Sequence, residues 1–500
     1  MIRLSSTLHL IRSDPKVSAC ASLMLFFLVM AGFFLLRYDS RYFISNSLWA
    51  EDGPVFIEAA LAHPWASITA PYSGYLHVYP RLLSALATVV PVAYLPTLLA
   101  AGWLAGIMFL WHIIAIGMAP RAAPRLAASA VLLGCLLQPH TGETFLSITN
   151  AQWWLAPALA LMACFPQRFS SFYSIPTLLL SLTGPFSILI LVPAWFQALK
   201  CKRYAIVLPL TAGATIQLFQ LIKNGRPHQV LDPELTHWLF NFATFFSWGN
   251  ESVWVQCAAG VFWAIAITAA LRGTWEYRSL LLCGILAYLS ALYAMKGMPA
   301  ALSPLGNGAR YFVLPYSAVI LATFLNPVLS RWQTYIAALA LLAIIFTAPV
   351  RIHQQETYYS AYAKLSAYED SLSIPLAPRI QNSPGFTLNV SAAQLPMVQY
   401  SPLLAGGTED IYAVATNSCG GVRAVGFVVE TNFPEAGYAA VRWKDSNDDG
   451  YASERRFYQA GPQRMQFAFT KNKKPVTVQF QAPAGSNPAQ IGKSYFLCLK

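Results

Sequence analysis

The sequence predicts an α-helical polytopic membrane protein of about eleven transmembrane helices, followed by a small C-terminal β-rich domain. The first observation is composition: 56% of the 500 residues are hydrophobic and only 11% are charged, whereas soluble domains are about 25% charged. The second is a series of apolar runs between residues 17 and 350, many near the length of a bilayer crossing. The third is the alternation of apolar and polar residues beyond residue 373, which has the period of a β-strand.

The first apolar run, residues 17–36, predicts a retained first helix. It is longer than the apolar core of a typical signal peptide, and no clear small-residue cleavage site follows it. Residues 1–16 are weakly basic, so the positive-inside rule places the N-terminus in the cytoplasm. The net charge of +12 comes from Lys and Arg residues spread thinly between apolar runs, which argues against a nucleic-acid-binding patch.

A long first outer loop is predicted at residues 37–94. Within it, residues 54–62 are expected to form a short helix, because a proline at its start suits the first helical turn. Residues 79–90 are apolar and are expected to form a helix in the plane of the membrane interface. If this segment crossed the membrane instead, Arg121 and Arg125 would lie outside, against the positive-inside rule.

The remaining spans follow in regular alternation. They are predicted at residues 95–118, 126–137, 151–165, 172–182, 186–199, 204–222, 252–271, 280–295, 311–329 and 334–350. Every inner loop then carries Lys or Arg, and the chain leaves the last span on the outer side. Several spans are shorter than the ~20 residues that a bilayer requires, which is tolerated where protein shelters a helix. Residues 1–350 are therefore expected to form one transmembrane domain.

The tail is predicted to be a helical linker at residues 351–372 and a β-rich domain on the outer side of the membrane at residues 373–500. Strands are expected at residues 385–390, 422–429, 464–469 and 475–480, which alternate in polarity and are separated by Gly and Pro turns. Cys419 and Cys498 would pair as a disulfide in an oxidising compartment. The alternative is two separate buried thiols.

The first candidate site is the carboxylate pair Glu51–Asp52 in the first outer loop. Adjacent carboxylates in a partly desolvated place repel each other, so one is expected to have a raised pKa, as a general base near neutral pH requires. The alternative is a helix cap beside a solvated neighbour, because Asp before Gly-Pro is a good capping arrangement. Asp39 is a further acidic candidate, although Arg37 and Arg41 flank it.

A second cluster follows the third predicted span. It contains the polar and aromatic residues His140, Glu143, Asn150, Gln152 and Trp153. Aromatic faces stack on sugar rings and polar side chains bond hydroxyl groups, so this composition suits sugar recognition. The alternative is an aromatic belt at the membrane interface with a capped turn.

A third cluster is cationic and lies on later outer loops. Its members are Lys223, Arg226, Lys296 and Arg310, with Tyr311 beside the last. Outer cations oppose the positive-inside bias, and a bound phosphate would account for them. The alternative is snorkelling, or an ion pair with Asp232 or Glu234. The sequence has no P-loop, no GxGxxG, no HExxH and no pair of CxxC motifs, so nucleotide-driven and zinc-thiolate chemistry are unsupported.

Three stretches resemble one known family. They are Trp49 to Pro54 in the first outer loop, Asn150 to Trp153, and Gly308 to Phe312. Together with the expected topology they resemble the GT-C superfamily of integral membrane glycosyltransferases. The resemblance is strongest to bacterial enzymes that use polyprenyl-phosphate sugars to decorate O-antigen, lipopolysaccharide or other cell-envelope glycans.

The resemblance implies hexosyl transfer on the periplasmic face of the bacterial inner membrane. It implies a polyprenyl-phosphate-linked sugar donor and a periplasmic glycan or lipid acceptor. Asp52 or Glu51 would take the proton of the acceptor hydroxyl, and Arg310, with Lys223 or Arg226, would steady the departing lipid phosphate. Some members of the superfamily use a divalent cation, and the sequence leaves that dependence open.

Two other functions remain as alternatives. A transporter that flips a lipid-linked sugar usually shows inverted repeats and ionisable groups at mid-membrane, whereas here the charges cluster on the expected outer face and no repeat is visible. An O-antigen ligase or polymerase also has many spans, and its essential groups would lie in a late outer loop rather than the first.

Overall fold

The structure of the chain is a computed structural model. It describes residues 15–37, 47–118, 123–140, 142–224, 230–306, 308–347, 359–365, 371–377, 385–391, 398–400, 404–406, 412–416, 419, 424–445, 452–469, 475–482 and 490–498. The chain divides into two compact units, which are described separately. Unit 1 comprises residues 1–41, 65–83 and 99–353, and unit 2 comprises residues 42–64, 84–98 and 354–500.

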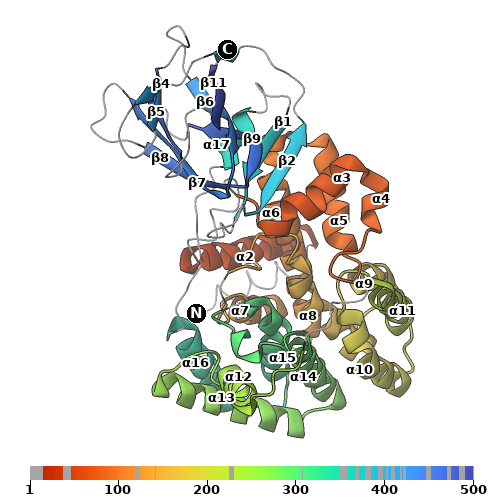
Figure 1. Cartoon of the computed structure of the whole chain (residues 1–500). Coiled ribbons are helices and arrows are strands. Elements are labelled where there is room, and N and C mark those ends of the chain that lie inside the picture. The colour runs from red at the N-terminus through yellow and green to blue at the C-terminus, as the bar shows by residue number, and fades with distance from the viewer. Residues whose placement is uncertain are drawn as a thin grey trace. The chain divides into compact units, whose positions relative to one another are not determined.

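Unit 1 is helical (Figure 1). The helices with most of their residues in it are α2 (Pro15–Leu36), α4 (Pro64–Ile68), α5 (Val78–Ala85), α6 (Leu95–Gly117), α7 (Pro124–Leu136), α8 (Ala151–Cys164), α9 (Ser174–Ser181), α10 (Phe186–Cys201), α11 (Val207–Asn224), α12 (Leu235–Phe246), α13 (Val253–Arg272), α14 (Trp275–Ala294), α15 (Val313–Phe324) and α16 (Arg331–Thr347). A helix therefore occupies each region where a span is expected.

Three helical segments are long and apolar enough to cross a membrane: residues Val92–Gly117, Val253–Arg272 and Trp275–Ala294. Among the described residues, several more apolar helices have only 10–17 residues, and α7, α8 and α10 are examples. The structure thus shows a mostly helical chain with candidate membrane helices. The full set of about eleven spans stays a prediction.

Helix α8 lies at the centre of unit 1. Every residue from Ala151 to Cys164 is buried, and the helix packs against α10, α14 and α15. A helix that is apolar all round is expected to be enclosed by other helices. This central helix carries Gln152 and Trp153 near its N-terminus, so both candidates are fixed to the most enclosed element of the unit.

Helix α12 lies where only a polar loop, residues 223–250, is expected from the sequence. The side-chain amide of the buried Asn241 donates hydrogen bonds to the carbonyls of Pro299 (3.1 Å) and Leu302 (2.6 Å). The helix therefore packs through one polar residue as well as through apolar contacts. Its short apolar stretch lacks the length that marks the spans in the sequence.

Unit 2 contains part of the first outer loop. A single 3-10 turn (Ala50–Asp52) leads into a π-helical turn (Gly53–Ile57) and then into α3 (Glu58–Ala62). This confirms the helix expected at residues 54–62, although its first turn is wider than an α-turn. Two further 3-10 turns, Leu86–Val89 and Val92–Tyr94, also belong to unit 2.

The C-terminal part of unit 2 is rich in β-strands, as the sequence predicts. The strands are β1 (Ser371–Pro375), β2 (Thr387–Ser391), β3 (Val398–Tyr400), β4 (Leu404–Gly406), β5 (Tyr412–Thr416), β6 (Ala424–Phe433), β7 (Gly437–Asp445), β8 (Ala452–Tyr458), β9 (Gly461–Ala468), β10 (Pro475–Gln481) and β11 (Ile491–Cys498). They form an antiparallel β1–β2 pair, a five-stranded sheet in the order β4-β5-β10-β7-β8, and a four-stranded sheet in the order β3-β11-β6-β9.

The two larger sheets pack face to face as a sandwich (Figure 1). Val441 and Phe480 of the five-stranded sheet share one buried core with Phe427, Phe467 and other residues of the four-stranded sheet. Alternate residues along each strand point into this core, as expected of packed antiparallel sheets.

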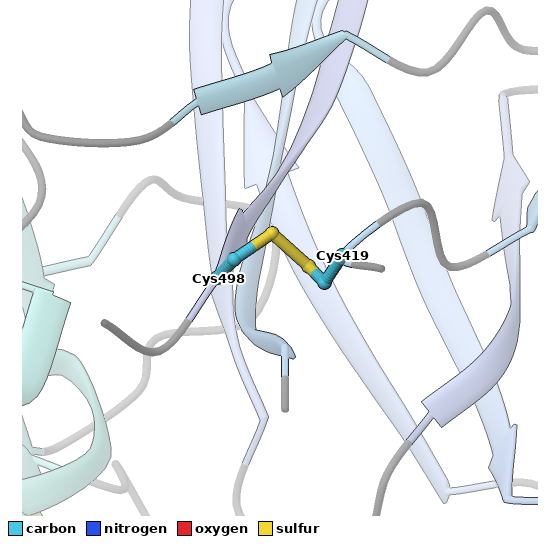
Figure 2. Close-up of a disulfide and its surroundings, with 2 residues drawn as sticks. All are labelled: Cys419 and Cys498. Carbon is cyan, nitrogen blue, oxygen red and sulfur yellow. A yellow bond between two sulfur atoms is a disulfide. The ribbon is translucent and has the colours of Figure 1, made fainter. Parts of the chain in front are cut away.

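One disulfide joins Cys419 to Cys498 within the sandwich (Figure 2). This is the pairing that the sequence predicts for an oxidising compartment, and the alternative of separate thiols is wrong. The bond closes a segment with a sequence separation of 79 residues, and both cysteines are buried in the core.

The linker helix α17 (Tyr359–Lys364) is fixed to the sandwich by a buried polar cluster. The Tyr362 hydroxyl lies 2.8 Å from both carboxylate oxygens of Glu454, and Arg456 Nε donates to Glu454 Oε1 at 3.2 Å. Burial raises the pKa of Tyr362 well above its usual value, so the hydroxyl stays protonated and donates. The linker and the sandwich therefore belong to one folded unit.

Candidate functional site

The loop between α7 and α8 is held by Thr144. Its carbonyl oxygen accepts hydrogen bonds from the indole N–H of Trp103 (2.8 Å) and of Trp154 (3.1 Å). Phe145, the next residue, is buried against the rings of Phe33, Trp103 and Trp154. A loop tied to several helices in this way keeps its side chains in fixed positions, which a binding site requires.

His140 is part of this loop and is only 1% exposed. Its Nδ1 accepts the backbone N–H of Gly142 at 2.7 Å, and its Nε2 lies 3.2 Å from Thr144 Oγ1. Burial, with the positive charges of Arg37 and Arg310, lowers the pKa of His140 to about 3. The ring is therefore neutral, carries its proton on Nε2 and donates to Thr144. This geometry gives His140 a positioning role within the loop.

Arg37 anchors the start of the same loop. Its Nη2 donates to the carbonyls of Leu137 (3.0 Å) and Gln138 (3.2 Å), and burial lowers its pKa to about 10. Arg37 directly follows helix α2, so the bond ties the end of the first helix to the loop. From the sequence, Arg37 is expected only as a flanking charge of Asp39.

Glu143 projects from this loop and binds Arg310. Glu143 Oε1 accepts the backbone N–H of Arg310 at 2.8 Å, and Oε2 accepts its guanidinium Nη1 at 2.9 Å. The Glu143 side chain is 12% exposed and the Arg310 side chain 37% exposed. Arg310 lies on a 3-10 turn (Ala309–Phe312) that begins after Gly308, whose φ of +75° suits glycine. The pair is fixed at the carboxylate and open toward solvent at the cation.

Aromatic rings flank the pair. The ring of Trp153 meets Tyr311 at 5.1 Å and Phe186 at 4.9 Å, both edge to face. The guanidinium carbon of Arg310 lies 5.4 Å from the centre of the Tyr311 ring. Asn150 donates from Nδ2 to the Glu143 carbonyl at 2.9 Å. The structure thus brings together five sequence-predicted candidates: Glu143, Asn150, Trp153, Arg310 and Tyr311.

Several buried polar atoms of this region have no protein hydrogen-bond partner among the described residues. They are both amide atoms of Gln138, Oε1 of Gln152 and Nε1 of Trp153. The Gln152 oxygen lies against Gly184, where a Cβ would be 2.4 Å away. An unsatisfied buried polar group costs about 1–3 kcal/mol, so such groups commonly mark binding or catalytic positions. Gln138 is an addition to the residues predicted from the sequence.

The carboxylate pair Glu51–Asp52 lies in unit 2. Asp52 is 1% exposed, and its Oδ2 accepts the backbone N–H of Trp49 at 3.3 Å. Glu51 is half-buried. The hydrogen bond closes the 3-10 turn in the way that the acid of a capping box does. The cap expected from Asp before Gly-Pro is a different contact, and the Asp52 side chain makes no cap hydrogen bond to the π-helical turn that follows it.

The same segment is attached to the β1–β2 hairpin of unit 2. Ala377 exchanges backbone hydrogen bonds with Leu48 and Ala50. Downstream, Glu58 Oε1 accepts the backbone N–H of Asn389 at 2.5 Å and its amide at 3.1 Å. A Cβ on Gly53 would lie 2.4 Å from Leu376, so glycine allows this close approach. The sequence predicts no role in the site for the tail, yet the tail holds the acidic segment in place.

The remaining candidates lie apart from these contacts. Lys223 is in the last turn of α11. The ammonium of Lys296 lies 4.9 Å from the Tyr293 ring centre, and its carbonyl accepts the N–H of Asp232. Asp232 and Glu234 are the expected alternative partners of these cations. Both carboxylates contact His237 instead. Asp39 and Arg226 fall outside the described residues.

Comparison with known proteins gives no match: no family model, no curated protein and no solved structure is similar to the chain. Within the described ranges, no group of three or more His, Cys, Asp or Glu side chains is placed to hold a metal ion. Any function therefore rests on the chemistry of the residues themselves.

Proposed function

We propose that this chain is an integral membrane glycosyltransferase that moves a sugar from a polyprenyl-phosphate donor to a periplasmic glycan or lipid. The proposal includes the full topology: about eleven spans in the bacterial inner membrane, a cytoplasmic N-terminus and a periplasmic β-rich domain. Three apolar segments of sufficient length and the disulfide in unit 2 are consistent with it. The resemblance of the sequence to GT-C enzymes supplies the reaction class.

The Glu143–Arg310 pair is the observation that carries the proposal. A guanidinium that a carboxylate holds at one edge keeps a fixed orientation, and Arg has five N–H donors suited to phosphate oxygens. The Trp153 and Tyr311 rings beside it provide the apolar faces on which sugar rings stack. A fixed cation next to aromatic rings is complementary to a sugar joined to a phosphate, because the cation suits the phosphate and the rings suit the sugar.

In the proposed reaction, Asp52 or Glu51 takes the proton of an acceptor hydroxyl. The hydroxyl oxygen attacks the anomeric carbon of the donor, and the bond between that carbon and the phosphate oxygen breaks. The lipid phosphate leaves with the bonding electron pair, and Arg310 stabilises its charge. Gln152 and Asn150 are assigned to the sugar hydroxyls, because amides both donate and accept hydrogen bonds.

Purified full-length protein tests this function directly. It is incubated with a panel of polyprenyl-phosphate hexoses and an extract of periplasmic glycans, and release of polyprenyl phosphate is measured together with labelled glycan. The proposal requires both products and a loss of about 10²-fold in Arg310→Gln, but not in the exposed Arg272→Gln. Movement of intact donor across a liposome membrane without cleavage would instead identify a flippase.

A further inference from the structure

The outer face of the five-stranded sheet has an unusual set of side chains. Along β7 and β10, Ala439, Val441, Val478 and Phe480 point into the sandwich core. Since successive side chains of a strand point to opposite faces, the intervening residues point outward. Where the structure describes the side chains on β7, β8 and β10, these outward residues are Tyr438, Ala440, Arg442, Ser453, Arg455, Phe457, Gln479 and Gln481.

The strand register places these residues in rows. Tyr438 is opposite Phe457, and Ala440 is opposite both Arg455 and Gln481. Arg442 is opposite Ser453 and Gln479. The small Ala440 is thus surrounded by two arginines, two amides and an aromatic pair. Both arginines are exposed, and the aromatic and amide residues are partly exposed.

The cationic and aromatic groups on this face are pre-organised. The guanidinium carbon of Arg455 lies 4.1 Å from the centre of the Tyr438 ring, and the Tyr438 and Phe457 rings meet edge to face at 5.2 Å. A stacked guanidinium is restricted in rotation, which reduces the entropic cost of binding a ligand.

The charge on this face has one sign. Among the outward positions whose side chains the structure describes on these three strands, there are two arginines and no carboxylate. Charged residues on the edge strand β8 protect a sheet edge from pairing with another chain, but that accounts neither for Arg442 on the interior strand β7 nor for the aromatic pair.

We propose that this sheet face binds an anionic glycan, that is, a polysaccharide with carboxylate or phosphate groups. The arginines pair with the acidic groups, the Tyr438–Phe457 pair packs against sugar rings, and Gln479 and Gln481 bond hydroxyls. The binding extends the proposed function, because a polymer retained here is the kind of acceptor that a transferase would modify. Binding itself requires no transfer.

Full-length protein in detergent, without donor lipid, tests the surface. Its affinity is measured for polygalacturonate, a carboxylate-bearing polymer, and for neutral dextran. We expect binding to polygalacturonate at least tenfold tighter than to dextran, weakened by salt. The double variant Arg442→Gln/Arg455→Gln loses that preference, and Tyr438→Ala weakens binding several-fold while keeping both charges.

The matched control is Lys493→Gln, which removes an exposed cation from β11 of the other sheet. It should bind like the unmodified protein. Equal affinity for both polymers would overturn the proposal, and so would a Lys493→Gln loss as large as that of the double variant Arg442→Gln/Arg455→Gln. Circular dichroism confirms that each variant is folded. An inactive transferase in the separate transfer assay would leave this binding result unaffected.

Discussion

Glu143 holds Arg310 through both of its carboxylate oxygens, one on the backbone N–H and one on the guanidinium. The two residues are 167 positions apart in the sequence. The contact joins the loop after α7 to the turn before α15, so a single carboxylate fixes both the position of the turn and the direction of its cation.

Glu143→Gln should impair transfer by misplacing Arg310. The amide cannot accept two charge-assisted hydrogen bonds from the backbone and the guanidinium, so the arginine is held less tightly. We expect kcat to fall about tenfold with a smaller change in KM, because the loss is in transition-state charge stabilisation. Glu251→Gln changes an exposed carboxylate and serves as the control. Equal activity of the two variants would show that the pair is only structural.

The free energy of unfolding should decrease as the pH is lowered, because His140 and His77 are buried in the neutral form. The pKa of His140 and that of His77 are each lowered to about 3, below the unfolded value of about 6.5. The unfolded chain therefore takes up protons below pH 6.5 that the folded protein does not. Between pH 7 and pH 5 each histidine should cost about 2 kcal/mol of stability.

The variant His140→Asn separates the two contributions. Asparagine replaces the Nδ1 acceptor for the Gly142 N–H without a group that titrates. The decrease in melting temperature in detergent between pH 7 and pH 5 should be smaller than that of the unmodified protein. The exposed His63→Asn should leave the decrease unchanged. An unaltered decrease in His140→Asn would contradict the assignment.

Loss of the disulfide should destabilise unit 2. Replacing Cys419 and Cys498 by Ser removes a cross-link with a sequence separation of 79 residues, which typically costs about 2–5 kcal/mol. The expected result is a lower melting temperature and faster proteolysis of the sandwich. The matched control is Cys257→Ser, which alters an exposed free thiol. Wild-type protease resistance in the double Ser variant would show that the bond is dispensable.

Gly53→Ala tests the attachment of the acidic segment to the β1–β2 hairpin. The added methyl would lie 2.4 Å from Leu376 Cδ1 and 3.1 Å from Leu388 Cβ. Relieving these clashes moves the hairpin or the segment and costs about 1–3 kcal/mol. We expect reduced transfer and a lower melting temperature. Gly260→Ala, with open space around its Cβ, should be neutral or slightly stabilising.

Much of the fold could be predicted because its signals are local. Long apolar runs located the helices, and alternating stretches located β2, β6, β9 and β10. The sequence does not predict helix α12, because its apolar stretch of twelve residues is short and is interrupted by Asn241, a polar residue that is buried in the structure. The attachment of Leu48 and Ala50 to Ala377 was also missed, since pairing between segments more than 300 residues apart leaves no local pattern.

The sequence predicts which residue types contribute to the site better than it predicts which of them contact one another. His140, Glu143 and Arg310 stood out as polar groups among apolar runs, but the choice of partner for Arg310 did not follow from the sequence. Glu143, rather than Asp232 or Glu234, forms the ion pair with Arg310. Gln138 and Thr144 were missed, since a single amide or hydroxyl beside a helix is common in any membrane protein.

The central claim is that a first-loop carboxylate is the base of a sugar transfer. The most direct measurement compares the rates of glycan transfer by Asp52→Asn and Glu51→Gln with that of the unmodified protein, at matched membrane expression and across pH 5–9. We predict that kcat falls at least ~10²-fold in one of the two variants. In that variant the decrease of the rate at acidic pH, which reports protonation of the base, should disappear. Full activity in both variants would contradict the assignment of the base.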